Sequence, residues 1–271
     1  IVAFYNSKTF LSRILEILDE ETEINGVVKH DLNGEIALKN VSFSYTRDSK
    51  KVLSNVSIEI KKGEKVAIVG SSGSGKSTLS KLLIGLFPAS SGSILFDDLD
   101  YNLLDKQYLR QQIGIVPQDM TLFNKTIHEN IAGDISVSEE EMTKICKLVN
   151  IHDEIMEMPM GYNTLVSEMG MNLSGGQRQR IILARALVKK PKIILLDEAT
   201  SYLDNVNEKE IMQKFKEQNI TIIVIAHRLS TIIDSNQIFV MDKGEIVEQG
   251  SHTELLNMKN GLYKKLYQTD Y

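Results

Sequence analysis

Residues 70–77 form the pattern in this sequence with the most specific chemical meaning. They read Gly-Ser-Ser-Gly-Ser-Gly-Lys-Ser and match G-x-x-x-x-G-K-[ST] at every fixed position. Glycines let the backbone turn tightly, so that successive N–H groups point inward at phosphate oxygens. Lys76 can then reach the β- and γ-phosphates of a nucleotide, and the Ser77 hydroxyl can coordinate Mg²⁺. The pattern therefore predicts a loop that holds a nucleoside triphosphate.

The segments on either side of this loop support that interpretation. Residues 65–69 read as a buried strand with an aliphatic run at 66–69, and a helical pattern covers residues 76–87. The start of a helix adds the positive end of its dipole to the backbone donors. A flexible turn rich in glycine and serine is the plain alternative, but such a turn would need neither the strand before it nor the helix after it.

Two acidic residues end a second hydrophobic segment. Residues 193–196 are aliphatic and are followed by Asp197 and Glu198. At the carboxyl end of a strand in an α/β sheet, Asp197 is expected beside the phosphate loop, where it can hold Mg²⁺ through water. Glu198 points elsewhere and can orient or deprotonate an attacking water. Many strands end in acidic turns, so this pair has meaning only together with the phosphate loop.

The other elements place these groups in an α/β fold. Three segments alternate apolar and polar residues, as in an antiparallel sheet with one wet face: 36–38, 41–45 and 56–60. Three segments are apolar on both faces, as in a parallel sheet covered by helices: 66–69, 193–196 and 220–226. Helical patterns cover residues 76–87, 176–188 and 208–216, and residues 119–172 look mostly helical.

The composition is that of an ordinary globular chain. The 271 residues are 42% hydrophobic, and 31 Lys and Arg against 36 Asp and Glu give a net charge of −5. Such a chain has no whole-molecule basic field to hold nucleic acid or anionic lipid. The single cysteine, Cys146, excludes an internal disulfide framework and is expected in the core. No apolar run approaches the ~20 residues that cross a bilayer.

The first residues suggest that more of the protein precedes this sequence. The chain begins at Ile1 rather than Met, and residues 8–18 have the spacing of an amphipathic helix. An acidic break at 19–23 and the turn signal Asn25-Gly26 follow. The segment is either an ordinary surface helix with a linker or the cytoplasmic end of a long helix from an absent domain.

Residues 173–177 make the sequence recognisable. They read LSGGQ, continued by Arg178, Gln179 and Arg180. This run resembles the signature of the ATP-binding cassette (ABC) ATPases, and together with the phosphate loop it is highly specific. The resemblance covers about residues 34–270. Further positions resemble the family's other motifs in order: Tyr45 the aromatic on which adenine stacks, Gln118 the Q-loop glutamine, residues 201–204 the D-loop and His227 the switch histidine.

The resemblance implies ATP hydrolysis, with ATP and Mg²⁺ as the bound groups. Glu198 would be the general base, His227 would contact the γ-phosphate and Lys76 would hold the phosphates. Mg²⁺ would be held directly or through water by these residues: Ser77, Gln118 and Asp197. The nucleotide would contact these residues, some of them from a second copy: Tyr45, Gly70, Ser71, Ser72, Gly73, Ser74, Gly75, Lys76, Ser77, Thr78, Gln118, Ser174, Gly175, Gly176, Gln177 and Asp204.

Three of these residues have plain structural alternatives. Tyr45 could be a half-buried aromatic residue of a sheet. Gln118 could be a solvated loop residue, and His227 could cap the helix that follows it. The other histidines, at positions 30, 128, 152 and 252, receive no role.

The signature also has a physical reading of its own. Ser174, Gly175 and Gly176 open a helix, so they form a second anion site in the same chain. Lys76 and Asp197 lie 121 residues apart, which leaves room for a helical insertion that carries the signature. In the family the two sites meet across a head-to-tail dimer, where the signature of one copy closes over the ATP of the other.

The implied fold class is α/β: a P-loop NTPase core with a mainly parallel sheet, an antiparallel β subdomain and a helical signature subdomain. The implied domains are a linker at 1–33 from an absent transmembrane domain and an ABC ATPase domain at 34–271, with the helical subdomain inserted at about 119–172. The helix at 8–18 and the loop at 165–170 resemble those of exporters. The implied partners are a second copy and the fused transmembrane domain, with no nucleic acid, at the cytoplasmic face of the cell membrane.

The cargo and two departures from the family pattern are left open. Bacteriocin and peptide exporters share the general look of this sequence, so a peptide is one candidate cargo. Tyr202 stands where the D-loop often has a small residue, and Ser167 stands where glycine is frequent. Neither change removes a catalytic group.

Two other classes of function are also kept open. A soluble ABC ATPase acting on DNA would split the two halves by a long coiled coil, and 121 residues without heptads are too few. One acting on ribosomes would carry two cassettes and basic regions. A regulatory module that binds ATP without turnover is disfavoured by Glu198 and His227. Phosphate release distinguishes the last class from an ATPase.

Overall fold

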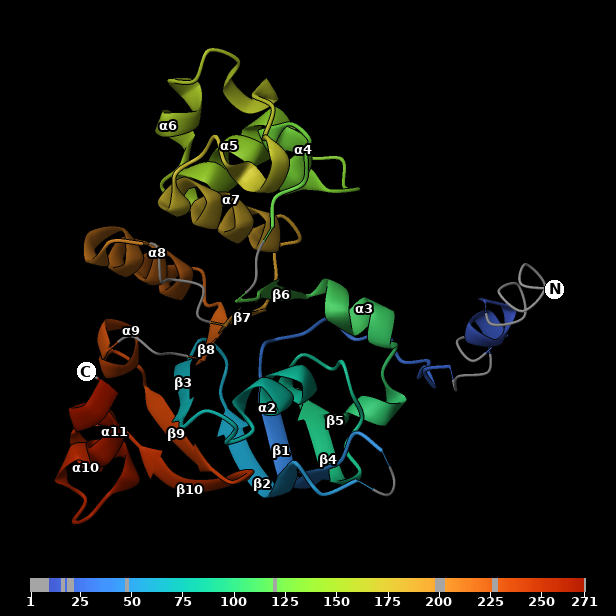
Figure 1. Ribbon diagram of the computed structural model, residues 1–271, viewed down its shortest axis with the longest axis vertical. Helices are drawn as coiled ribbons and strands as arrows, with labels where there is room; N and C mark the ends of the chain where they lie inside the picture. The colour runs from blue at the N-terminus through green and yellow to red at the C-terminus, as the bar shows by residue number, and fades with distance from the viewer. Residues whose placement is uncertain are drawn as a thin grey trace.

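The larger sheet is mainly parallel and leads into the phosphate loop. The computed structural model describes residues 10–15, 18, 22–46, 49–118, 121–197, 203–225 and 229–270. The strands of this sheet are β3 (Lys65–Gly70), β6 (Ile113–Val116), β7 (Ile193–Asp197), β8 (Thr221–Ile225), β9 (Gln237–Asp242) and β10 (Glu245–Gly250). Their order is β10-β9-β3-β8-β7-β6, and all neighbours are parallel except β10 and β9 (Figure 1).

Alternate residues of the central strands enter two different cores. Val66 and Ile68 of β3 belong to the core shared with the smaller sheet, whereas Ala67 and Val69 belong to the core shared with the helical part of the chain. Successive side chains of a strand point to opposite faces, so a strand between two cores must be apolar at every position. The parallel sheet predicted from the aliphatic runs is therefore confirmed, and β6, β9 and β10 are additional strands of it that the patterns did not indicate.

The smaller sheet is antiparallel, as the alternating segments predict. It consists of β1 (Ile36–Phe43), β2 (Leu53–Ile60), β4 (Ser91–Phe96) and β5 (Leu99–Asp100), in the order β2-β1-β4-β5. The segments 36–38 and 41–45 form one strand, with an irregular register around Asn40, whose φ is 51°. Because β1 ends at Phe43, the prediction that Tyr45 lies within a strand is wrong.

Helices surround the sheets and form a separate helical part. Those associated with the sheets are α2 (Lys76–Leu83), α3 (Lys106–Gln111), α8 (Asn205–Glu217), α9 (Leu229–Ile233), α10 (His252–Asn257) and α11 (Leu262–Asp270), with a 3₁₀ turn η1 (Tyr101–Leu103). The helical part contains α4 (Ile127–Ala132), α5 (Glu139–Leu148), α6 (His152–Met156) and α7 (Gly175–Leu187), with turns η2 (Gly161–Asn163) and η3 (Glu168–Gly170). It stands beyond the β6 edge of the larger sheet, at the top of Figure 1. Cys146 is fully buried in its core, as predicted.

The N-terminal segment is a short helix followed by a linker that is fixed to the core. The helix predicted at 8–18 is described at residues 10–15, and its apolar side chains are 47–66% exposed. Glu23 then forms two hydrogen bonds with Arg110 of α3, each 2.7 Å long. The N–H groups of Gly26 and Val28 donate to the carbonyl oxygens of Leu104 and Leu103, at the end of η1. Within the described residues, no helix has the length and apolar character needed to cross a membrane.

Candidate nucleotide-binding site

The phosphate loop connects the end of β3 to the start of α2. Gly70 closes the strand at φ 155°, and a Cβ atom there would lie 2.4 Å from the backbone oxygen of Met241 in β9. Gly73 has φ 77°, a left-handed conformation that L side chains rarely adopt, although a Cβ there would meet no atom within 4 Å. The first glycine is therefore required by close packing and the second by backbone conformation.

Two buried polar groups line the loop. Lys76 is only 8% exposed, and its Nζ donates to the carbonyl oxygens of Gly70 and Ser71 at 2.7 and 3.0 Å. The Ser74 hydroxyl is buried and has no hydrogen-bond partner among the described residues. A buried cation and an unsatisfied hydroxyl at a helix start suit an anionic ligand with several oxygen atoms. The loop therefore fits the phosphates of a nucleotide.

Tyr45 lies beside α2 rather than inside the sheet. Its ring packs edge-on against Phe43 and Phe87, with centroids 5.0 and 5.8 Å apart. Its hydroxyl is 3.1 Å from the hydroxyl of Thr78, and Lys81 Nζ lies 5.5 Å from the ring centroid. The residue remains 49% exposed. A rigidly held aromatic ring with an exposed surface can stack on a planar base.

Gln118 and Asp197 lie at the same edge of the larger sheet as the phosphate loop. Asp197 is the last residue of β7, and Gln118 comes two residues after β6. The strands β3, β8, β7 and β6 are parallel neighbours, so their carboxyl ends share one edge. Asp197 is half-buried and Gln118 is exposed. An oxygen-rich edge next to a phosphate loop suits Mg²⁺, which prefers carboxylate, carbonyl, water and phosphate oxygens.

Several predicted residues lie outside the described part of the chain. Glu198 directly follows the end of β7, and His227 comes two residues after the end of β8. Tyr202, which stands where the D-loop often has a small residue, also lies outside the described residues.

The signature residues form the start of α7. Ser174 is the N-cap, and its hydroxyl accepts from the backbone N–H of Gln177 at 3.1 Å. Gln177 Oε1 accepts from the Ser174 N–H at 2.9 Å, which completes a reciprocal capping box. The helix predicted from Gly175 and Gly176 is confirmed. Ser174 is exposed, so its turn is presented to solvent.

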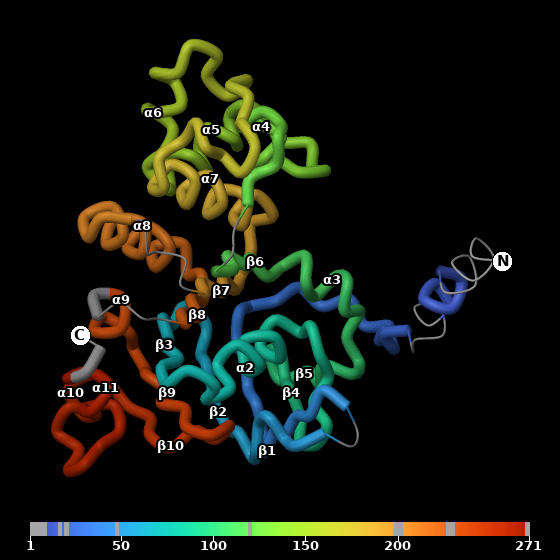
Figure 2. Tube along the Cα trace, in the orientation of Figure 1, coloured from blue at the N-terminus to red at the C-terminus, as the bar shows by residue number. Residues whose placement is uncertain are grey.

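The two motifs predicted to bind anions belong to different parts of the molecule. The phosphate loop lies between β3 and α2, whereas α7 lies in the helical part, and the two regions are well separated in Figure 2. Asp204 occupies a third place, as the N-cap of α8, where its carboxylate accepts from the N–H groups of Val206 and Asn207. The hydrogen bond from the Asn207 amide is the main cause that holds the pKa of Asp204 below its usual value.

Sequence reasoning did not indicate the residues that hold the signature turn. Arg180 is 8% exposed and donates to Gly176 O and to Glu154, and Glu154 also accepts from Gln177. One signal was present, because Gln177 and Arg180 are three residues apart on a helix and so lie on one face. The position of Glu154, on a different helix, had no signal in the sequence.

Comparison with known proteins agrees with this arrangement. Residues 53–201 match the ABC transporter family. The chain is 50% identical over 263 residues to the leukotoxin translocation ATP-binding protein LktB of Mannheimia glucosida, and 49% identical to that of Bibersteinia trehalosi. Each match covers 95% of this chain and 37% of the relative, so the chain spans little more than a third of these proteins.

A solved structure is also similar along nearly the whole chain. It is described as a bacterial Atm1-family ABC exporter with ATP bound, and it matches with a TM-score of 0.87 and 42% identity. The match covers 95% of this chain and 46% of that one. The chain therefore belongs to the ABC transporter family, as an ATPase domain of the exporter type.

Proposed function

We propose that this chain binds ATP with Mg²⁺ and hydrolyses it in a head-to-tail dimer, which powers export of a polypeptide by the whole protein. The observation that carries the proposal is the meeting of the phosphate loop, Gln118 and Asp197 at one edge of the parallel sheet. Inward-turned N–H groups, a buried ammonium and a carboxylate supply the charge and hydrogen bonds that a metal-bound triphosphate needs.

The phosphates are held by the loop and by the start of α2. Lys76 neutralises the β- and γ-phosphates, aided by the N–H groups of residues 71–78. Ser77, Gln118 and Asp197 would hold Mg²⁺, directly or through water. When bound, this ion offsets the negative charge that the phosphates develop during transfer. Phosphoryl transfer needs little covalent chemistry from the protein, so most of the rate comes from positioning and charge.

Three residues complete the proposed site. Glu198 accepts the proton of the attacking water, and His227 contacts the γ-phosphate. Tyr45 stacks on adenine with its exposed surface, while Phe43 and Phe87 hold its ring from the side.

Dimerisation explains why one chain carries two anion-binding helix starts. Ser174 is exposed and caps α7, which stands in the helical part, apart from β3 and α2 on either side of the phosphate loop (Figure 1). A two-fold pair brings each exposed turn over the loop of the other copy and so completes two identical sites. The γ-phosphate then bridges the copies, and hydrolysis removes the bridge.

The whole protein is proposed to contain a membrane-spanning part. Residues 1–33 would join that part to an ATPase domain at 34–271, with the helical subdomain inserted at about 119–172, at the cytoplasmic face of the cell membrane. Support comes from the exposed apolar side chains of residues 10–15 and from the length of the relatives, of which this chain covers 37%. The proposed partners are the membrane-spanning part and a second copy, with no nucleic acid.

Phosphate release measured against protein concentration tests the proposed hydrolysis. With Mg-ATP in excess, we expect the rate per molecule to rise with concentration, because each active site needs two copies. Nucleotide binding without phosphate release at any concentration would instead indicate a binding module, or an ATPase that requires its membrane-spanning part.

The cargo is proposed to be a polypeptide because the relatives are named for leukotoxin translocation. Inside-out vesicles that carry the whole protein should take up a labelled secreted polypeptide when ATP is added. Uptake should stop in the Lys76→Ala variant of the whole protein. Equal uptake by the two proteins would contradict a polypeptide cargo moved by this ATPase.

A further inference from the structure

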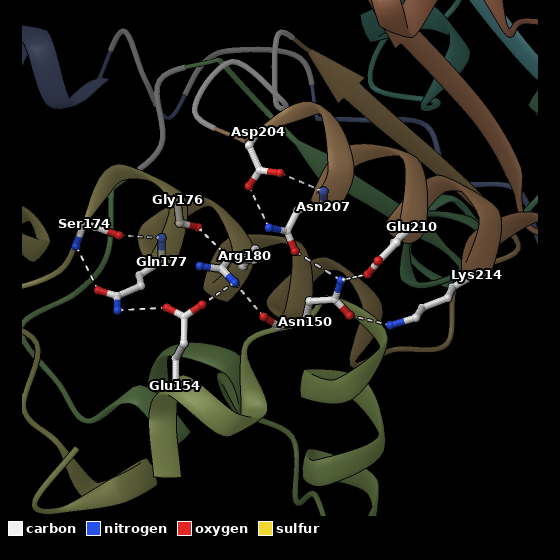
Figure 3. Close-up of polar contacts among 10 residues, drawn as sticks. All are labelled: Asn150, Glu154, Ser174, Gly176, Gln177, Arg180, Asp204, Asn207, Glu210 and Lys214. Carbon is white, nitrogen blue, oxygen red and sulfur yellow. Dashed lines mark hydrogen bonds and ion pairs between the residues drawn. The ribbon is translucent and has the colours of Figure 1, made fainter. Parts of the chain in front are cut away.

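A continuous set of polar contacts joins the signature turn to the cap of α8, as Figure 3 shows. At the signature end, the Gln177 side chain has two partners. Its Oε1 accepts from the Ser174 N–H at 2.9 Å, and its Nε2 donates to Glu154 Oε2 of α6 at 3.0 Å. The turn at Ser174 is therefore tied to a second helix and not only to its own.

Arg180 extends these contacts through the interior of the helical part. Its Nη1 donates to Glu154 Oε1 and to the backbone oxygen of Asn150, each at 2.6 Å. Its Nε donates to Gly176 O at 3.2 Å. Charge-assisted hydrogen bonds of this kind hold their partners strongly, and a buried cation that lost one would be left poorly solvated. One side chain thus holds α6, the turn after α5 and the signature turn together.

Asn150 carries the contacts from the helical part to α8. It follows α5 in a left-handed conformation, with φ 56°. Its Nδ2 donates to Asn207 Oδ1 at 3.1 Å and to Glu210 Oε2 at 2.7 Å, while its Oδ1 accepts from Lys214. Both polar atoms of the Asn150 side chain therefore form hydrogen bonds with α8, while its backbone oxygen accepts from Arg180.

At the far end, Asn207 holds the cap of α8. Its Nδ2 donates to Asp204 Oδ2 at 2.6 Å, and its backbone N–H donates to Asp204 Oδ1 at 3.0 Å. The signature turn and the Asp204 cap are thus the two ends of one hydrogen-bonded path through Asn150, Arg180 and Glu154.

We propose that Asn150 is a positioning residue that holds the signature turn of the helical part in a fixed relation to the Asp204 cap of the sheet-bearing part. Its role in catalysis rests on the proposed dimeric function, because both ends of the path would then face the partner's nucleotide. The coupling itself is a property of the single chain and can be measured without nucleotide.

The Asn150→Asp variant removes the two contacts that the Asn150 amide donates to α8, with little change in shape. Aspartate tolerates the left-handed backbone but cannot donate to Asn207, and it places a second carboxylate beside Glu210. Without nucleotide, we expect amide hydrogen exchange at residues 174–178 to become about tenfold faster, the equivalent of one or two lost hydrogen bonds. With Mg-ATP, the protein concentration for half-maximal phosphate release should rise about tenfold, while the rate at saturating concentration stays within about twofold.

A second substitution should reverse this effect. In the double variant Asn150→Asp, Glu210→Gln, the new amide at position 210 can donate to the new carboxylate at position 150, so exchange at residues 174–178 should slow again. Glu141→Gln is the control on α5, because it removes the charge from a 2.5 Å ion pair with Lys190 that lies outside the path. The control should leave exchange at residues 174–178 unchanged.

Unchanged exchange at residues 174–178 in folded Asn150→Asp would overturn the proposal. If that variant does not fold, Lys214→Gln tests the same path from α8, with the exposed Lys209→Gln on the same helix as its control. Faster exchange for Lys214→Gln and not for Lys209→Gln supports the coupling, and equal exchange for the two rejects it. A wild-type chain that releases no phosphate would contradict the proposed function alone, since the exchange comparison is made without nucleotide.

Discussion

Replacing Lys76 by alanine is expected to weaken ATP binding by about 10- to 100-fold and to lower turnover by about 10²- to 10³-fold. The Lys76 ammonium is buried within the phosphate loop and bonded to its carbonyl oxygens, so it needs little reorganisation to meet a phosphate. A charge that is already held in place stabilises a transition state more than a charge that is surrounded by water. Titration with a fluorescent ATP analogue and an assay of phosphate release would measure both effects.

The matched control for this variant is Lys62→Ala. Lys62 is an exposed lysine in the turn before β3, so its removal changes the net charge equally but leaves the loop intact. Thermal unfolding of both variants would separate loss of binding from loss of fold. Near-normal ATP affinity in Lys76→Ala would show that the loop holds something other than the phosphates of ATP.

The Glu198→Gln variant is expected to keep ATP binding and to lose nearly all turnover. Glutamine has the size of glutamate but cannot accept a proton at neutral pH, and a positioned general base contributes about 10²- to 10⁴-fold in rate. Since the γ-phosphate would no longer be removed, the ATP-bound dimer should accumulate. Phosphate release gives the rate, and light scattering during gel filtration with ATP gives the mass.

Glu245→Gln provides the comparison for this result. Glu245 is an exposed glutamate at the start of β10, on the edge strand of the larger sheet, so the same change of charge should leave turnover and mass unaltered. If the Glu198→Gln variant keeps wild-type turnover, Glu198 is not the general base. Loss of turnover without a rise in dimer mass would contradict the bridging role of the γ-phosphate.

The strands near the phosphate loop could be predicted because they are apolar at successive positions, which indicates burial on both faces of the sheet. Val66 and Ala67 enter different cores, and so do Ile193 and Ile194. A polar residue at any of these positions would be buried without a partner, so each position is apolar. The strand β9 was missed although it is equally buried, because Gln237 and Asp242 at its ends and the adjacent β10 interrupt the aliphatic pattern. Its place beside β3 depends on pairing across 171 residues.

The sequence pattern around Tyr45 is local, and it predicted a strand at this residue where the structure has none. The alternation of residues 41–45 predicts a strand throughout, but β1 ends at Phe43. Tyr45 contacts instead Thr78 of α2 and Phe87, which follows that helix. These partners come from 33 and 42 residues away, so their effect on the backbone at Tyr45 has no local signature.

The sequence by itself determined the phosphate loop, the signature turn and the α/β class of this protein. These features depend mainly on neighbouring residues. The glycines at positions 70 and 73 and the serine N-cap act through local backbone conformation, and the aliphatic strands act through burial. Only the tertiary structure decided that the Ser174 turn and the Asp204 cap are joined through Asn150. That junction is made by hydrogen bonds between side chains 57 and 60 residues apart, and their partners are set by where the turn after α5 lies against α8.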